Sequence, residues 1–197
     1  MNTLYWALPL AYLIGAIPFG RLVGIAALHK ELASGVGNPG PFVFLLTGRR
    51  YWAAAVWLLE AGKIVSVVAL GVFILTLPIW QVACLMFAAT FGHMFSVFSK
   101  FRPCRNLVAQ SGAWLAAHYG VFLVLGAVWL FVVWRTGRPV LASWITLGLS
   151  PLIAYPFSNI YFAVALLALA ILDFLLGRRD FRSLRLRQDI HWRPTWR

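Results

Sequence analysis

The sequence predicts an all-α, polytopic membrane protein, and three observations support that prediction. Of the 197 residues, 62% are hydrophobic and only 11% are charged, whereas a typical soluble domain carries about 25% charged residues. The mean hydropathy is +0.83. Most apolar residues also fall in runs that approach or exceed the roughly 20 residues that span a bilayer. We therefore expect a single transmembrane domain over residues 1–176 and a basic cytoplasmic tail over residues 177–197.

Seven apolar segments are separated by turn-forming or basic stretches, and each is expected to form a transmembrane helix. The first lacks the basic leader and small-residue cleavage pattern of a signal peptide, so we expect it to be retained. A Gly/Pro-rich loop, Ser34–Pro41, and a short apolar piece, Phe42–Leu46, follow it. The expected helices are Leu4–Leu28, Trp52–Leu77, Trp80–Phe98, Leu107–Ala117, Val121–Trp134, Val140–Tyr155 and Ile160–Leu176.

The distribution of Lys and Arg predicts the orientation in the membrane. The turns at Pro78, His118–Gly120 and Pro156–Asn159 carry neither residue, whereas the alternate loops and the tail are basic. Because cytoplasmic loops are enriched in Lys and Arg, we expect the N-terminus outside and the C-terminus in the cytoplasm. The net charge of +12 is then explained by attraction to anionic membrane lipid, and it does not indicate nucleic-acid binding.

Two ionisable residues interrupt the second apolar segment. Glu60 and Lys63 are three residues apart, so on a helix they occupy neighbouring positions of one face. Charged groups inside a membrane helix face a protein interior or a wet cavity. Two interpretations stay open, a mutually neutralising structural pair and a phosphate-binding Lys63 that is positioned by Glu60.

A second group of candidates surrounds the end of the third segment. His93 precedes the basic loop 100–106, which contains Arg102 and Arg105, and an imidazole beside bound phosphate can act as acid or base. The same loop can equally serve as a membrane anchor. In the Gly/Pro-rich loop, glycines allow backbone amides to approach an anion closely, and Ser34 is its one hydroxyl. Cys84 and Cys104 form no metal or redox spacing, and no metal site is predicted.

Five stretches of this chain together resemble a known family, the bacterial integral-membrane glycerol-3-phosphate acyltransferases that use acyl-phosphate. Residues 16–20, AIPFG, are similar to the first-helix pattern SIPFG. The second and third segments contribute Glu60 with Lys63, where the family has Asp and Lys, and residues 92–102, which resemble GHxFPxFxxFK. The remaining matches are Gly37-Asn38-Pro39-Gly40 with the SGNxGATN motif and Leu141-Ala142-Ser143 with an LAS motif.

The resemblance implies a membrane enzyme of phospholipid biosynthesis in the bacterial inner membrane. Such an enzyme has seven membrane helices and transfers an acyl group from acyl-phosphate to glycerol-3-phosphate, giving lysophosphatidic acid, without a cofactor. Cationic side chains and loop amides suit two phosphate-bearing substrates. Carried over to this chain, the implied catalytic residues are His93 and Ser34, with supporting roles for Glu60 and Arg49. The implied phosphate-binding residues are Gly37, Asn38, Gly40, Lys63, Arg102, Arg105 and Ser143.

The chain also departs from the family pattern, and the departures leave an alternative open. Val36 occupies the position of the first motif's serine when the motif is aligned without gaps, and the family's KGGKG becomes residues 102–106, RPCRN. The alternative is a non-catalytic relative that acts as a structural or lipid-binding subunit, with other membrane-protein subunits as partners. A transporter is a third, weaker alternative, because the chain shows no internal repeat.

Overall fold

The chain folds into a bundle of helices in a computed structural model, which describes residues 3–28, 40–104 and 107–184. Within these ranges the regular elements are all helical, as the sequence predicts. The longer helices are α1 (Leu4–Ala16), α2 (Phe19–Leu28), α4 (Arg50–Ala69), α5 (Ile79–Met94), α6 (Leu107–Ala117), α7 (Tyr119–Thr136), α8 (Pro139–Phe157) and α9 (Ile160–Leu184). The short ones are α3 (Pro41–Leu46), a π-helical turn η1 (Leu70–Ile74) and a 3₁₀ turn η2 (Val97–Ser99).

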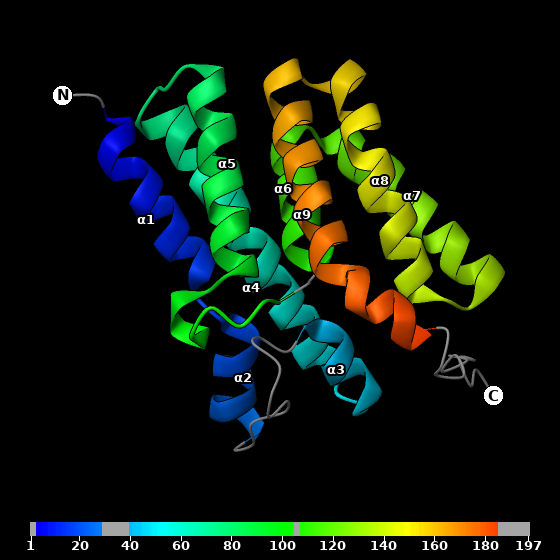
Figure 1. Ribbon diagram of the computed structural model, residues 1–197. Helices are drawn as coiled ribbons and strands as arrows, with labels where there is room; N and C mark the ends of the chain where they lie inside the picture. Colours follow the sequence, from blue (N-terminus) through cyan, green and yellow to red (C-terminus); the bar gives the residue numbers. More distant parts are fainter. Residues whose placement is uncertain (1–2, 29–39, 105–106, 185–197) are drawn as a thin grey trace.

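The long helices run alternately up and down through the bundle (Figure 1). One end holds the start of α1 and the turns η1–α5, α6–α7 and α8–α9. The other end holds α2, α3, η2, the α7–α8 turn and the end of α9. Apart from Lys63 in the middle of α4, every described Lys and Arg lies on these elements or beside them. The closest helix pairs are α1 with α5, α4 with α6, and α8 with both α7 and α9.

Five helical stretches are long and apolar enough to cross a membrane: Leu4–Ala26, Arg50–Ile74, Ile79–Ser99, Tyr119–Thr136 and Pro139–Phe157. Leu107–Ala117 and Ile160–Leu176 are shorter apolar helices. The predicted turn at His118 is confirmed, because α6 ends at Ala117 and α7 begins at Tyr119. The short apolar piece after the Gly/Pro-rich loop is also helical, as α3.

Two boundaries differ most from the sequence-based expectation. The first segment was expected as one helix, but Pro18 has no N–H and disfavours a helical conformation at the residue before it. Ile17 accordingly takes φ −59° and ψ 118°, and the segment divides into α1 and α2. At the other end of the chain, α9 continues to Leu184, so the stretch expected as a tail begins within a helix.

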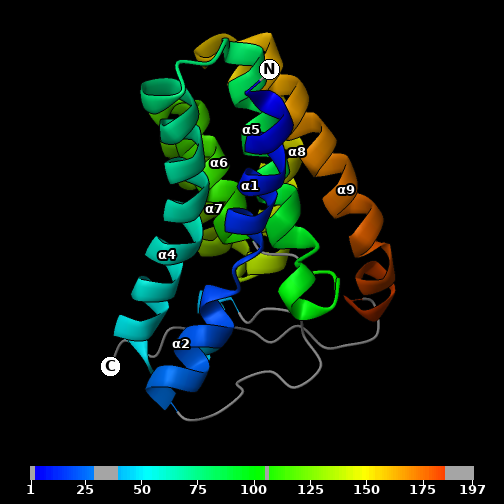
Figure 2. The same ribbon diagram turned by 90° about the vertical axis from the view of Figure 1, so that its left-hand side faces the viewer.

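Glycines allow the helices of the N-terminal half to touch through their backbones. A Cβ added at Gly15 of α1 would collide with the carbonyl of Ala89 in α5, and one at Gly92 of α5 would collide with the carbonyl of Tyr12. Small residues at crossing points are the usual means of close helix packing in membranes. Figure 2 shows the result, with α1 lying along α5 and α2 turning away below the break.

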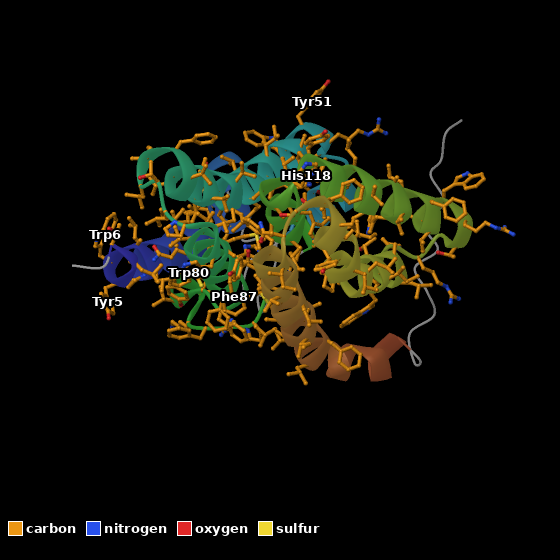
Figure 3. The ribbon with its side chains drawn as sticks, turned by 90° about the horizontal axis from the view of Figure 1, so that it is seen from above. Tyr5, Trp6, Tyr51, Trp80, Phe87 and His118 are labelled. Atoms are coloured by element: carbon orange, nitrogen blue, oxygen red, sulfur yellow. The ribbon has the colours of Figure 1, made fainter. Side chains whose placement is uncertain are left out.

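Large apolar side chains cover the outer surface, as lipid contact requires. Aromatic residues stand at both ends of the bundle, where membrane proteins place them at the water interface. Tyr5 and Trp6 point outward from the start of α1, and Tyr51 points outward from the start of α4 at the opposite end (Figure 3). Tyr51 is 93% exposed and Tyr5 is 80% exposed. The bundle has the surface of an integral membrane protein.

Candidate functional site

The site is built around the interruption of the first membrane helix. In a continuous α-helix the N–H of Gly20 would donate to the carbonyl of Ala16. Pro18 prevents this, and the two backbone groups are left facing a membrane interior in which each unsatisfied group is costly. The chain makes short-range bonds instead, from Ile17 N to the Ile14 carbonyl over 3.3 Å and from Phe19 N to the Ile17 carbonyl over 3.1 Å.

Side chains from α4 and from the start of η2, just after α5, supply the missing partners. Gly20 donates its backbone N–H to Glu60 Oε1 over 3.1 Å. Ser96 donates its hydroxyl to the Ala16 carbonyl over 2.5 Å, and Lys63 donates to the Ile17 carbonyl over 2.7 Å. These bonds join residues 40 to 80 positions apart in the chain. They fix the two halves of the first helix to its neighbours.

Glu60 and Lys63 form the buried ion pair that one of the two sequence interpretations expected. Lys63 Nζ lies 2.6 Å from Glu60 Oε2, and Glu60 is 0% and Lys63 is 6% exposed. Lys63 Nζ also lies 5.7 Å from the centroid of the Phe19 ring, within the range of a cation–π contact. The ammonium therefore has an anion, a carbonyl and an aromatic face around it.

His93 completes the cluster from the last turn of α5. Its Nδ1 lies 3.1 Å from Glu60 Oε2, and the side chain is 2% exposed. When Nδ1 donates its proton to the carboxylate, a neutral imidazole keeps a lone pair on Nε2. Among the described residues, Nε2 is a buried atom without a hydrogen-bond partner. The imidazole is thus held on one side and can still accept a proton on the other.

The chain after α5 folds back tightly onto the end of that helix. Lys100 and Phe101 adopt positive φ values of 54° and 55°. The backbone N–H of Cys104 donates to the Met94 carbonyl, and the Tyr12 hydroxyl donates to the Phe95 carbonyl, over 2.9 Å and 2.7 Å. These bonds satisfy carbonyls that a helix end leaves free. Lys100 and Arg102 stand exposed on this return segment, next in the chain to His93's helix.

The other predicted site residues have different positions. Arg49 is exposed at the start of α4, about 16 Å along the helix axis from Glu60. Gly40 caps α3 at φ −75° and ψ 170°. Ser143 in α8 donates to the Pro139 carbonyl over 2.8 Å and accepts from Trp129 Nε1 over 3.2 Å. The structure thus links His93 with Lys63 and Glu60 but gives Ser143 partners in α7 and α8. Ser34, Gly37, Asn38 and Arg105 lie outside the described residues.

Sequence reasoning missed the backbone partners of this cluster. Pro18 was the available signal, because a proline inside a membrane helix frees backbone groups that need polar partners. Glu60, Lys63 and Ser96 are such partners. A second buried polar contact also escaped it, from Gln110 Nε2 of α6 to Asp173 Oδ2 of α9 over 2.8 Å. In the part of the chain that the structure describes, no group of three His, Cys, Asp or Glu could hold a metal ion, and Cys84 and Cys104 form no disulfide.

Proteins of known family are similar to this chain over almost its whole length. A family model described as glycerol-3-phosphate acyltransferase matches residues 5–184. A glycerol-3-phosphate acyltransferase of Nitrobacter winogradskyi is 31% identical over 179 residues, which are 90% of each chain. One of Jannaschia sp. is 33% identical over 184 residues, or 91% of this chain and 88% of the relative.

Solved structures share the fold. Crystal structures of PlsY, an integral membrane glycerol 3-phosphate acyltransferase, in its lysophosphatidic acid form and its glycerol 3-phosphate form, each align with a TM-score of 0.79. Sequence identity is 22% for the first and 21% for the second, and each alignment covers 94% of this chain and 93% of the other. From the match of residues 5–184 and the identity to its relatives, the chain belongs to the glycerol-3-phosphate acyltransferase family.

Proposed function

We propose that the protein is a membrane acyltransferase of phospholipid biosynthesis that acylates glycerol-3-phosphate to lysophosphatidic acid. The observation that carries this proposal is the family match over residues 5–184, which leaves only the two ends of the chain unmatched. The relatives reported above are themselves named as glycerol-3-phosphate acyltransferases. The comparisons therefore do not favour the non-catalytic alternative.

The acyl donor is proposed to be acyl-phosphate. In this reaction a hydroxyl oxygen of glycerol-3-phosphate attacks the carbonyl carbon of the donor. The bond from that carbon to the phosphate oxygen breaks, inorganic phosphate leaves, and the hydroxyl proton passes to a base. Both substrates carry phosphate and the donor carries an acyl tail, so a cationic site at the membrane surface suits them.

We propose seven membrane crossings with the N-terminus outside and the C-terminus in the cytoplasm of a bacterial inner membrane. The alternating helix directions support it, because α6 and α9 then add two short crossings to the five longer ones (Figure 1). The gathering of Arg49, Arg50, Lys100, Arg102, Arg135 and Arg138 at the end opposite the start of α1 supports the orientation. Cytoplasmic loops are the basic ones, and anionic lipid is the proposed partner of this end.

Within the site, His93 is proposed as the acid or base and Arg102 as a phosphate-binding residue. The first role is supported by His93 Nε2, for which the described part of the chain offers no hydrogen-bond partner. The exposure of Arg102 on the segment that returns from α5 supports the second. The family motifs extend phosphate binding to Gly37, Asn38, Gly40, Arg105 and Ser143, with Ser34 as the hydroxyl and Arg49 as a supporting cation. For Lys63 the contacts with Glu60 and the Ile17 carbonyl favour a positioning role over phosphate binding.

The direct test is product formation by purified protein in lipid nanodiscs. With acyl-phosphate and glycerol-3-phosphate we expect lysophosphatidic acid, detected by mass spectrometry. One inorganic phosphate should be released for each lysophosphatidic acid formed. Acyl-CoA in place of acyl-phosphate should give no product. Absence of product from both donors, in protein that remains folded, would contradict the proposed function.

A matched pair of substitutions tests the phosphate role of Arg102. Arg102→Ala should raise the KM for glycerol-3-phosphate about tenfold, since a charge-assisted hydrogen bond contributes about 1.5 kcal/mol or more. Arg135→Ala removes an exposed arginine from the α7–α8 turn at the same end of the molecule and should leave KM unchanged. Equal effects of the two would assign Arg102 a general electrostatic role only.

His93→Gln tests the acid–base role. The amide keeps a polar group near Glu60 but cannot accept a proton, so kcat should fall about 100-fold, within the range of general acid–base catalysis. The KM for both substrates should stay within about threefold of wild type. A fall in apparent affinity without a fall in kcat would contradict the role.

A further inference from the structure

The buried charges of α4 have an unusual set of partners. Glu60 Oε1 accepts the N–H of Gly20, and the Ser96 hydroxyl donates to the carbonyl of Ala16. These two backbone groups are the donor and acceptor of one of the helical bonds that would join α1 to α2 in an unbroken helix. This lost backbone bond is therefore replaced by two side-chain bonds, one from Glu60 of α4 and one from Ser96 at the start of η2.

Lys63 is engaged in the same interruption. Its Nζ contacts Glu60 Oε2 at 2.6 Å and the Ile17 carbonyl at 2.7 Å, and it lies 5.7 Å from the ring centroid of Phe19. Ile17 and Phe19 flank Pro18 on its two sides. An ammonium that binds a substrate phosphate needs donors directed at that phosphate, whereas this one is directed at a carboxylate and a carbonyl.

The burial of these side chains also favours a structural role for the cluster. Glu60 is 0% exposed and Ser96 is 4% exposed. A buried ion pair is stabilising only when further hydrogen bonds satisfy its remaining atoms, and here the backbone of the broken helix provides them. His93, through its Nδ1 contact with Glu60 Oε2 at 3.1 Å, ties the last turn of α5 to the same carboxylate.

We propose that Glu60, Lys63 and Ser96 form a helix-break cluster whose role is positioning: it holds α2 at a fixed angle to α1 and against α4. This inference rests on the proposed function, because α2 leads into the Gly/Pro-rich loop that is proposed to bind phosphate. In this assignment Lys63 does not touch the substrate. It acts through the backbone of Ile17 and through Glu60.

Hydrogen exchange of the backbone amides tests the structural half of the proposal, on full-length protein in nanodiscs. Ser96→Ala should speed exchange in peptides covering residues 12–28 by about tenfold, because the end of α1 loses a partner. Thr90→Val is the matched control: Thr90 of α5 carries a fully buried hydroxyl six residues before Ser96, and it donates to the Met86 carbonyl of its own helix. It should leave exchange in these peptides within twofold of wild type, and equal effects of the two variants overturn the proposal.

Activity tests the other half with a pair of variants that both lack Lys63. Lys63→Met removes the ammonium that contacts Glu60 Oε2 and leaves the carboxylate buried. The double variant Glu60→Gln, Lys63→Met removes that charge and keeps an amide oxygen that can accept from Gly20 N–H. A positioning role predicts at least tenfold more activity in the double variant than in Lys63→Met, with a near-normal KM for glycerol-3-phosphate.

A phosphate-binding role for Lys63 predicts different results from the same experiments. If Lys63 contacts phosphate, the double variant is no more active than Lys63→Met, its KM for glycerol-3-phosphate is raised, and exchange over residues 12–28 is normal in both. That result overturns the proposal. If the wild-type protein makes no lysophosphatidic acid, the proposed function fails, and the exchange comparison of Ser96→Ala with Thr90→Val still decides whether the cluster holds the break.

Discussion

The N-terminal half and the C-terminal half of the bundle satisfy their buried polar groups differently. Around α1, α2, α4 and α5, side chains bond to backbone groups far away in the sequence, as Glu60 does to Gly20 and Ser96 to Ala16. In α8, Thr146 and Ser150 bond to carbonyls of their own helix, three or four residues earlier. Among the described residues, the second half also has long-range bonds, from Gln110 to Asp173 and from the Ser158 hydroxyl to the Ala117 carbonyl, but they do not repair a helix break.

This difference separates two ways of using polar residues in a membrane. A hydroxyl that bonds within its own helix costs little to bury and places no demand on neighbouring helices. A side chain that bonds to a distant backbone group requires its own helix and the other to stay in register. Variants in the N-terminal half should therefore cost more than matched variants in the C-terminal half.

The largest difference is expected at glycines. Gly15→Ala should lower the free energy of unfolding by about 3 kcal/mol, because overpacking forces the backbones of α1 and α5 apart. Gly148 is the matched control, since a Cβ there meets no atom within 4 Å. Gly148→Ala should be neutral or stabilise by up to about 1 kcal/mol, the helix-propensity gain. Unfolding in mixed micelles measures both, and a cost at Gly148 equal to that at Gly15 would contradict the comparison.

A smaller difference is expected between two buried hydroxyls. Ser96→Ala leaves the Ala16 carbonyl without its side-chain partner and should cost about 1–2 kcal/mol, the upper range for interhelical hydrogen bonds in membranes. Thr146→Val removes a hydroxyl that bonds to its own helix at the carbonyls of Ala142 and Ser143. It should cost less than about 0.5 kcal/mol. The same unfolding titration compares them, and the two variants should separate clearly.

Much of the fold follows from hydropathy and turn residues. The positions of α4, α5, α6, α7 and α8 are close to the expected segments, because runs of apolar residues ended by Pro, Gly or basic residues leave few alternatives. The division of the first segment at Pro18 did not follow. A proline in a membrane helix can produce a bend or a full interruption, and the outcome depends on whether neighbouring helices offer partners to the freed backbone groups.

The site was predictable in part for the same reason. Helical spacing predicts that Glu60 and Lys63 are neighbours, and the structure confirms a pair at 2.6 Å. Spacing within one helix carries no information about contacts between helices, so the addition of His93 to this pair, and the bonds to Ile17 and Gly20, required the packed bundle. Ser143 illustrates the same limit. The LAS motif identified the residue, but the motif could not show that Trp129 of α7 would be its partner.

One hydrogen bond within a helix of the C-terminal half is expected to contribute to stability, which is an exception to the difference between the two halves. Pro151 has no N–H, so the Leu147 carbonyl lacks its usual helical donor. Ser150 donates its hydroxyl to that carbonyl over 2.8 Å. Ser150→Ala should therefore cost about 1 kcal/mol. In a Pro151→Ala background the helix supplies an N–H, and the same Ser150→Ala change should be nearly neutral, so a double-mutant cycle measured by unfolding should show coupling. Additive effects would mean that the hydroxyl does not replace the missing donor.

The smallest effect is expected at the turn between α6 and α7. His118 is extended at φ −173° and its Nδ1 accepts the backbone N–H of Gly120 over 3.0 Å, capping α7. His118→Ala removes this cap and should cost about 1 kcal/mol or slightly less, the usual value for a helix N-cap. His118→Asn keeps an acceptor suited to the cap and should recover most of the loss. Because this turn lies at the end of the bundle opposite Arg102 (Figure 1), the KM for glycerol-3-phosphate should be unchanged in both variants, and a raised KM in His118→Ala would show that the two ends are coupled.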